Sequence, residues 1–192
     1  LGYDVEECRS LHKKYDSKEI SHKMWCDKTA EKFIEKNMNI SVLDDISKKI
    51  HLINGVEETF KTLKNKNIKI CIVSGSIFDI IKNVLNELSM YVDEIKANDF
   101  KFSREGYLEE IIGTSYDFEG KANYVIEKAE LLRISTKDIL FVGNSFNDQY
   151  VHESGARTLC INPKYTDISN HKIWNECIQE CNDLQEIMKY VD

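Results

Sequence analysis

Apolar and polar positions change their period along the chain, and after Asn54 strand-like runs alternate with helical ones. Continuous β-branched or apolar runs predict strands buried on both faces at residues 68–73, 139–142 and 158–161. Helical spacing fills the intervals, at residues 56–63, 76–88, 121–132 and 146–153. Strands that alternate with helices predict an α/β fold with a doubly wound parallel sheet.

The first fifty residues carry only helical patterns. Asp16-Ser17 is predicted to cap one helix, and Ser41 with Asp44 resembles the cap of a second. Residues 100–112 alternate in a way that predicts a β-hairpin turning at Glu105-Gly106. The C-terminal segment is predicted to be helical, which would place Cys177 and Cys181 on one helix face.

Composition narrows the possible partners and location. A net charge of -7 disfavours a nucleic-acid partner, and no apolar run approaches the roughly 20 residues that cross a bilayer, so no membrane partner is expected. The six cysteines are scattered rather than dense, which favours reduced thiols over a disulfide scaffold or a zinc site. The expected location is therefore the cytoplasm.

Ser74-Gly75-Ser76 follows the first predicted strand at the start of a predicted helix. A hydroxyl and free backbone N–H groups at such a junction can hold a phosphate. The alternative is structural: Ser74 ends the strand and Ser76 caps the helix.

Lys121 follows Gly120 at the start of another predicted helix, where a cation opposes the helix dipole. A bound anion would justify that position, whereas the alternative is a solvated surface lysine. Because a lysine at a helix start stabilises little, we expect Lys121→Ala to weaken phosphate binding more than folding and to change stability by well under about 1 kcal/mol.

The third polar cluster follows the strand at 139–142, in the string Gly143-Asn144-Ser145-Phe146-Asn147-Asp148. Its amide, hydroxyl and carboxylate oxygens could bind Mg²⁺. Alternatively, the turn only caps the helix that follows it.

The order of these clusters resembles the haloacid dehalogenase-like phosphatases, in particular their phosphoserine phosphatase-like branch. The matching strings are Gly55-Val56-Glu57, residues 72–76, Gly120-Lys121-Ala122 and residues 142–148. The resemblance implies a Rossmann-like core at residues 54–192 and a small helical cap at residues 1–53.

The resemblance also implies a mechanism, in which an aspartate nucleophile takes the phosphoryl group beside Mg²⁺. Ser74 and Gly75 would bind the phosphate, and Lys121 would neutralise it and hold the nucleophile. Asn144 would bind Mg²⁺ and Asp148 would order the metal's surroundings. The substrate would be a small phosphorylated metabolite, with phosphoserine as one candidate.

The chain departs from the family pattern in two places. No Asp-x-Asp follows an apolar strand before Ser74, so the nucleophile strand is expected ahead of Leu1, and Asn144 stands where the family has a metal-binding aspartate. One hypothesis is therefore a phosphatase whose nucleophile segment lies outside this chain. A second is a catalytically impaired relative that binds a phosphate ester or a protein, and a third is an unrelated flavodoxin-like module.

The resemblance implies that the absent strand would lie between the strands ending at Ser74 and Val142. We expect a gap there, to be filled by an upstream segment or by a strand donor, because unpaired strand edges are costly to bury. Direct pairing of those two strands would contradict this expectation.

Overall fold

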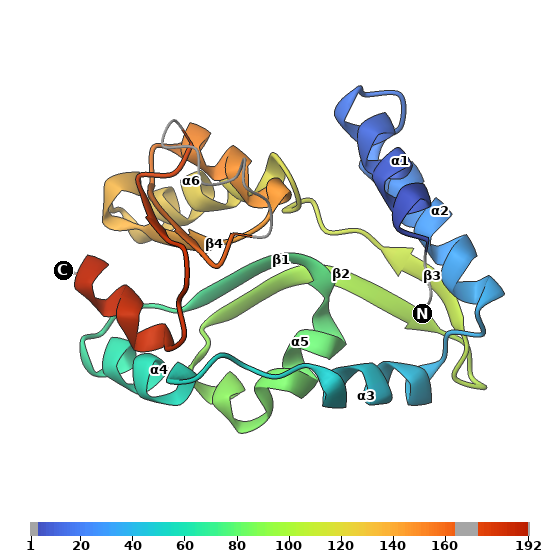
Figure 1. The fold of residues 1–192 in the computed structure, drawn as a ribbon, viewed down its shortest axis with the longest axis horizontal. Helices are drawn as coiled ribbons and strands as arrows, with labels where there is room; N and C mark the ends of the chain where they lie inside the picture. The colour runs from blue at the N-terminus through green and yellow to red at the C-terminus, as the bar shows by residue number, and fades with distance from the viewer. Residues whose placement is uncertain (1–3, 164–172, 192) are drawn as a thin grey trace. The chain divides into compact units, whose positions relative to one another are not determined.

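The computed structural model describes residues 4–163 and 173–191, and it confirms an α/β fold with parallel strand pairs. The chain forms two compact units (Figure 1). Unit 1 consists of the described part of Leu1–His51 with Ser76–Asn86 and Ala97–Thr114. Unit 2 consists of Leu52–Gly75, Glu87–Lys96 and the described part of Ser115–Asp192. The division therefore cuts the chain several times, and the role of the N-terminal helices as a cap stays a prediction.

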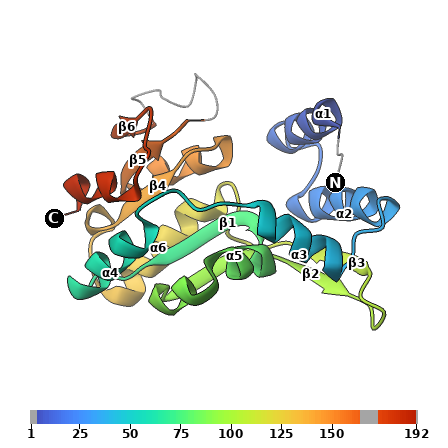
Figure 2. The ribbon, with the colours of Figure 1, turned by 60° about the horizontal axis from the view of Figure 1, so that its bottom comes forward.

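Unit 1 is built from four helices and a hairpin. Its elements are α1 (Val5–Asp16), α2 (His22–Glu35), α3 (Ile40–Lys49), α5 (Phe78–Leu85), β3 (Leu108–Ile112) and the second part of β2 (Glu94–Phe102). Helix α2 packs on β3, and α3 lies beside α5 (Figures 1 and 2). The hydrophobic core between them includes Cys26, Met38 and Phe100.

The two predicted N-terminal caps are wrong. Asp16 and Ser17 end α1 instead of starting a helix, and α2 begins after Ser21, whose Oγ accepts the Met24 N–H at 3.2 Å. Asn39 rather than Ser41 caps α3. Several polar residues in this region could serve as a cap, and the chosen one is the residue whose extended backbone lets its side chain reach the free N–H groups of the first turn.

Unit 2 holds the remaining elements. They are α4 (Val56–Asn65), most of η1 (Asn86–Tyr91), α6 (Gly120–Leu132), η2 (Thr136–Asp138), β4 (Leu140–Gly143), η3 (Phe146–Ser154), β5 (Arg157–Ile161), β6 (Glu176–Ile178) and η5 (Leu184–Tyr190). The strand β1 (Cys71–Ile77) begins in unit 2 and, like β2, crosses into unit 1. Helix α6 packs against η3, which brings the start of α6 close to the turn after β4.

The strands form two three-stranded sheets, in the orders β1-β2-β3 and β4-β5-β6. The predicted hairpin is confirmed: β2 and β3 are antiparallel, and Gly106 adopts a φ of 84° in the connecting turn. In the described residues β1 and β4 are edge strands of different sheets, so the direct pairing that would have contradicted the expected gap is not seen.

Burial differs between these edges and the strand next to them. All four residues of β4 are only half-buried, although their apolar run predicted burial on both faces. The neighbouring strand β5 is buried over Thr158–Cys160, with Leu159 and Cys160 at 0% exposure. The apolar residues of β4 therefore have incomplete cover in the described part of the chain.

The C-terminal segment is not the single helix that was predicted. Cys177 lies in β6 directly opposite Cys160 of β5, and Cys181 follows in the loop, so the two C-terminal cysteines do not share a helix face. Residues 164–172 of that segment lie outside the described part. The described cysteines with placed side chains are free thiols, as expected. Within the described ranges, no helix is both long and apolar enough to cross a membrane.

Candidate functional site: a buried lysine–aspartate pair at a strand edge

Ser74 and Gly75 lie inside β1, which continues for two residues beyond Gly75 to Ile77. Helix α5 starts only at Phe78, with Ile77 before it, so the predicted capping role of Ser76 is wrong. The hydroxyl residues here keep an extended backbone because β1 pairs with β2 over this stretch. Ser74 and Gly75 nevertheless belong to unit 2, the unit that also holds Lys121 and Asp148.

A tight turn sets the start of α6. The Gly120 N–H donates to the Asp117 carbonyl at 2.8 Å, and the Lys121 N–H donates to the Phe118 carbonyl at 3.1 Å. A Cβ at Gly120 would lie 2.0 Å from the Ser115 carbonyl oxygen, a distance no side chain tolerates. The turn therefore requires glycine at position 120, and it carries Asp117 and Lys121 together at the helix start.

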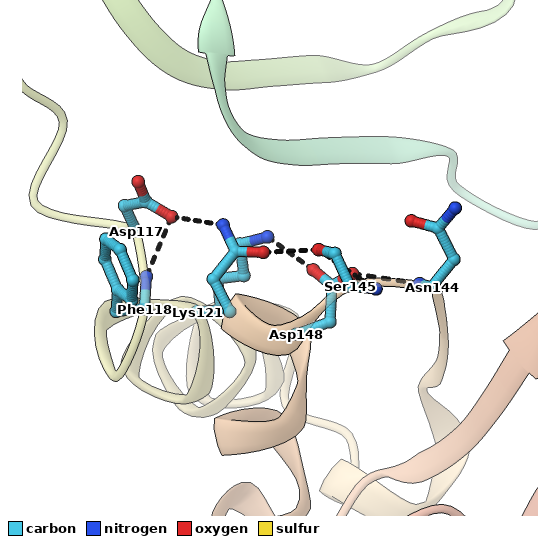
Figure 3. Close-up of polar contacts among 7 residues, drawn as sticks. Asp117, Phe118, Lys121, Asn144, Ser145 and Asp148 are labelled. Atoms are coloured by element: carbon cyan, nitrogen blue, oxygen red, sulfur yellow. Dashed lines mark hydrogen bonds and ion pairs between the residues drawn. The ribbon is translucent and has the colours of Figure 1, made fainter. Parts of the chain in front are cut away.

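Lys121 is buried and paired with Asp148. Its Nζ lies 2.5 Å from Asp148 Oδ1, and the two residues are 3% and 7% exposed (Figure 3). The alternative of a solvated surface lysine is therefore wrong. The packing of α6 on η3 removes both charged groups from water, and each then needs the other as its counter-ion.

Asp148 also organises the turn after β4. Its Oδ2 accepts the backbone N–H groups of Asn144 and Ser145, both at 2.9 Å, and so caps the start of η3. Burial alone would raise the pKa of Asp148, but Lys121 and these N–H donors hold it below its usual value. Asp148 is thus ionised at neutral pH, and both its oxygens already accept hydrogen bonds within the protein.

Asn144 lies at one end of the row of polar side chains and Asp117 at the other (Figure 3). The structure uses the backbone N–H of Asn144 to hold Asp148, and its side chain is half-buried. The metal roles of Asn144 and Asp148 stay predictions. Within residues 4–163 and 173–191 no three His, Cys, Asp or Glu residues gather as a metal-binding group, and Asn144 and Asp148 are the residues that would hold Mg²⁺.

Sequence reasoning missed Asp117. It is 6% exposed, its Oδ1 accepts the Asn147 amide at 2.9 Å, and a Cβ at Gly75 would lie 2.4 Å from its Oδ2. The carboxylate therefore contacts β1 and η3 from the turn that leads into α6. The only signal in the sequence was its place four residues before Lys121, in a turn that ends in glycine.

Comparison with known proteins identifies the family. The model of the pyrimidine 5'-nucleotidase (UMPH-1) family matches residues 4–159, which is most of the chain. This chain belongs to that family. The matched range includes every residue of the site, from Ser74 to Asp148.

Individual relatives carry a different name. The chain is 28% identical over 159 residues to the phosphoserine phosphatase of Methanocaldococcus jannaschii, covering 81% of this chain and 71% of that protein. It is 27% identical over 129 residues to the phosphoserine phosphatase of Archaeoglobus fulgidus, covering 67% of this chain but only 37% of that protein. The chain thus spans little more than a third of one of these relatives.

Solved structures share the fold. A substrate-bound phosphoserine phosphatase complex superposes with a TM-score of 0.75 at 21% identity, covering 97% of this chain and 85% of that one. A HAD-family hydrolase from Salmonella enterica serovar Typhi gives a TM-score of 0.72 at 15% identity, covering 97% and 62%. The resemblance to haloacid dehalogenase-like proteins of the phosphoserine phosphatase type is confirmed.

Proposed function

We propose that this chain forms the phosphate-binding part of a phosphomonoester hydrolase that works through an aspartyl-phosphate. The observation that carries the proposal is that Lys121 is buried at the start of α6, where its ammonium group is bound by Asp148. Ser74 and Gly75 belong to the same unit. A buried cation at a helix start is a suitable environment for a phosphate dianion, and we propose that the Ser74 hydroxyl of the same unit adds a donor to it.

Several groups of the chain would donate hydrogen bonds to the phosphate. The Lys121 ammonium has three N–H donors, of which one meets Asp148, and the others can donate to phosphate oxygens. The Ser74 hydroxyl and the backbone at Gly75 would add further donors. Because Asp148 already holds Lys121 in one orientation, the lysine does not have to be ordered when the anion binds.

The nucleophile is the part that the chain does not supply. Both oxygens of Asp148 are hydrogen-bonded, and Asp117 is buried against Gly75 and Asn147, so neither carboxylate suits attack on phosphorus. We propose that an aspartate on an added strand, pairing with the edge strands β1 and β4, forms the covalent intermediate. We propose Mg²⁺ as the cofactor of the protein with that strand, because the added aspartate would supply a carboxylate ligand of the kind that Mg²⁺ needs.

For the substrate we propose a pyrimidine nucleoside 5'-monophosphate ahead of phosphoserine. The family model that names this activity matches residues 4–159, whereas the phosphoserine phosphatases are matched at less than 30% identity. Both substrates are small phosphorylated metabolites, and the phosphate site treats them alike.

The second candidate is a relative that binds phosphate esters without hydrolysing them. Asn144 favours it, because an amide replaces the carboxylate charge on which Mg²⁺ sites depend. Retained binding of phosphate is common to both candidates, so the two differ only in turnover.

Calorimetry with inorganic phosphate tests binding in the chain as it stands. The chain should bind phosphate, and the double variant Lys121→Met with Asp148→Asn, which removes the charged pair without stranding either partner, should not. Equal affinity in both proteins would contradict the proposed site.

Turnover is tested by adding a synthetic apolar strand that ends in Asp-x-Asp, with Mg²⁺ present. Release of phosphate from uridine 5'-monophosphate only when the peptide is present supports the hydrolase. Binding without release, also after Asn144→Asp, supports the non-catalytic candidate. Faster release from phosphoserine would overturn the substrate proposal alone.

A further inference from the structure

Asp117 is a buried carboxylate that the proposed chemistry does not use. It lies in the turn before α6, and its Oδ1 accepts two hydrogen bonds at 2.9 Å, from Asn147 Nδ2 and from the Phe118 N–H. Its place in the row of polar side chains is shown in Figure 3. Burying a carboxylate costs free energy unless hydrogen bonds compensate for the lost water, so the partners of Asp117 are important to the fold or to the site.

The second oxygen of Asp117 lies against β1. A Cβ at Gly75 would come within 2.4 Å of Asp117 Oδ2, so only glycine leaves room for this carboxylate beside the strand. One side chain therefore contacts three elements of unit 2: β1 at the residue after Ser74, the start of α6, and η3 through Asn147.

Asp117 also decides which way the Asn147 amide faces. A carboxylate can only accept, so the NH₂ end of the amide must point to Asp117, and its oxygen is then turned toward the Ser145 hydroxyl. That hydroxyl has one proton and two acceptors in reach, Asn147 Oδ1 and Asp148 Oδ2. Since Asp148 Oδ2 already receives two backbone N–H groups, the proton goes to Asn147.

We propose that Asp117 is the positioning residue of this site: it fixes the Asn147 amide and, through it, the Ser145 hydroxyl beside the Lys121–Asp148 pair. The proposal rests on the proposed phosphate-binding function, but its first consequence concerns the protein without any ligand. In this proposal Asp117 acts through Asn147 and not by contact with the substrate. It acts by setting the direction of the hydrogen bonds from Asn147 and from Ser145, next to Asp148.

The direct test is the Asn147 side-chain amide, observed by NMR and assigned from its absence in Asn147→Asp. In Asp117→Asn the new amide can present its own NH₂ group, so the bond to Asn147 is lost or reversed. We expect the Asn147 NH₂ signals to shift and their exchange with water to accelerate about tenfold or more, the effect of losing roughly 1.4 kcal/mol of protection.

A matched control and a rescue separate positioning from general destabilisation. Asp93→Asn alters another carboxylate of unit 2, which accepts the Ile70 N–H at 2.8 Å and pairs with Lys64, and it should leave the Asn147 signals unchanged. The swap Asp117→Asn with Asn147→Asp restores a donor–acceptor pair, and the exchanged carboxylate can still accept from Ser145. It should recover phosphate affinity that Asp117→Asn lowers about tenfold.

The outcomes are distinct. If Asp117→Asn, like Asp93→Asn, changes neither the NMR signals of the Asn147 amide nor the affinity for phosphate, the proposal is overturned. If the unaltered chain binds no phosphate, the proposed function fails, and the amide signals still decide whether Asp117 positions Asn147. If Asp117→Asn does not fold, the swapped pair carries the test, and its failure to bind phosphate while folded overturns the proposal.

Discussion

Replacement of Lys121 by Met should destabilise the protein by about 3 kcal/mol, because it leaves the Asp148 carboxylate buried without a counter-ion. Breaking a buried ion pair by removal of one partner costs about 3–5 kcal/mol, and two unit charges about 4 Å apart attract by about 4 kcal/mol at the effective dielectric of a protein. Because Asp148 would still accept hydrogen bonds from two backbone N–H groups, we expect a loss at the lower end of that range of about 3–5 kcal/mol. This corrects the small effect on stability that the sequence predicted for removal of Lys121, because the lysine is buried in an ion pair.

The chain offers a matched control for burial. Lys61 and Glu57 pair at 2.6 Å, almost the separation of Lys121 and Asp148, but their side chains are 50% and 51% exposed rather than 4% and 9%. Lys61→Met should therefore leave the urea midpoint unchanged within error, because solvent screens the exposed pair. Urea unfolding of the unaltered chain and the two variants measures the difference.

Two further measurements would expose an error in this reasoning. In Lys121→Met, burial should raise the pKa of Asp148 above its unfolded value, so the loss of stability should shrink as the pH falls through that raised pKa. Adding Asp148→Asn should recover at least about 2 kcal/mol. A loss under about 1 kcal/mol for Lys121→Met at neutral pH, or no recovery in the double variant, would refute the buried pair.

Three more predictions follow from single contacts. Burial opposes ionisation of Glu94, but hydrogen bonds, led by the one from Lys128, hold its pKa at about 2. The ionised Glu94 therefore contributes about 1–2 kcal/mol to the free energy of unfolding after screening, and this contribution is present above pH 4.5 and lost toward pH 2. Urea unfolding of Glu94→Gln should depend less on pH in that range than urea unfolding of the unaltered chain. Burial raises the pKa of Cys160 to about 12, so iodoacetamide should label exposed Cys71 at least about 100-fold faster, as mass spectrometry can show. Gly120→Ala should lower the melting temperature markedly, by more than about 5 °C, since its Cβ has no room.

The elements that the sequence predicted well are those whose signals are local. The hairpin was marked by alternation and by Gly106, which adopts a positive φ. Helix α6 starts at Gly120, one residue before the predicted start, because the tight turn that leads into it admits no side chain there. In both cases a few neighbouring residues decide the conformation, so the pattern and the structure agree.

The misplaced boundaries have a common cause. Ser76 and Ser41 are good capping residues, but β1 continues through the first and α3 already includes the second. Whether a serine caps a helix depends on the backbone around it, which tertiary packing sets. The strand at Cys177 was missed because its three residues become recognisable only beside β5.

The site shows the same limit at longer range. Lys121 and Asp148 were both predicted as functional, yet their pairing joins positions 27 residues apart and depends on α6 packing against η3. Asp117 carried no pattern at all, because its importance comes from contacts with Gly75 and Asn147 that exist only in the folded chain.

Asp148 and Asn144 show why one position of this turn keeps its carboxylate while the other has an amide. Within the described residues, the charge at 148 is needed by the protein itself, because Lys121 and the start of η3 both depend on it. Asn144 contributes its backbone N–H to that arrangement, a role that any residue except proline can fill. Loss of charge at 144 therefore costs the fold little, whereas loss at 148 would strand a buried lysine. It follows that the Lys121–Asp148 pair serves the fold in either proposed function, and that only turnover distinguishes the two.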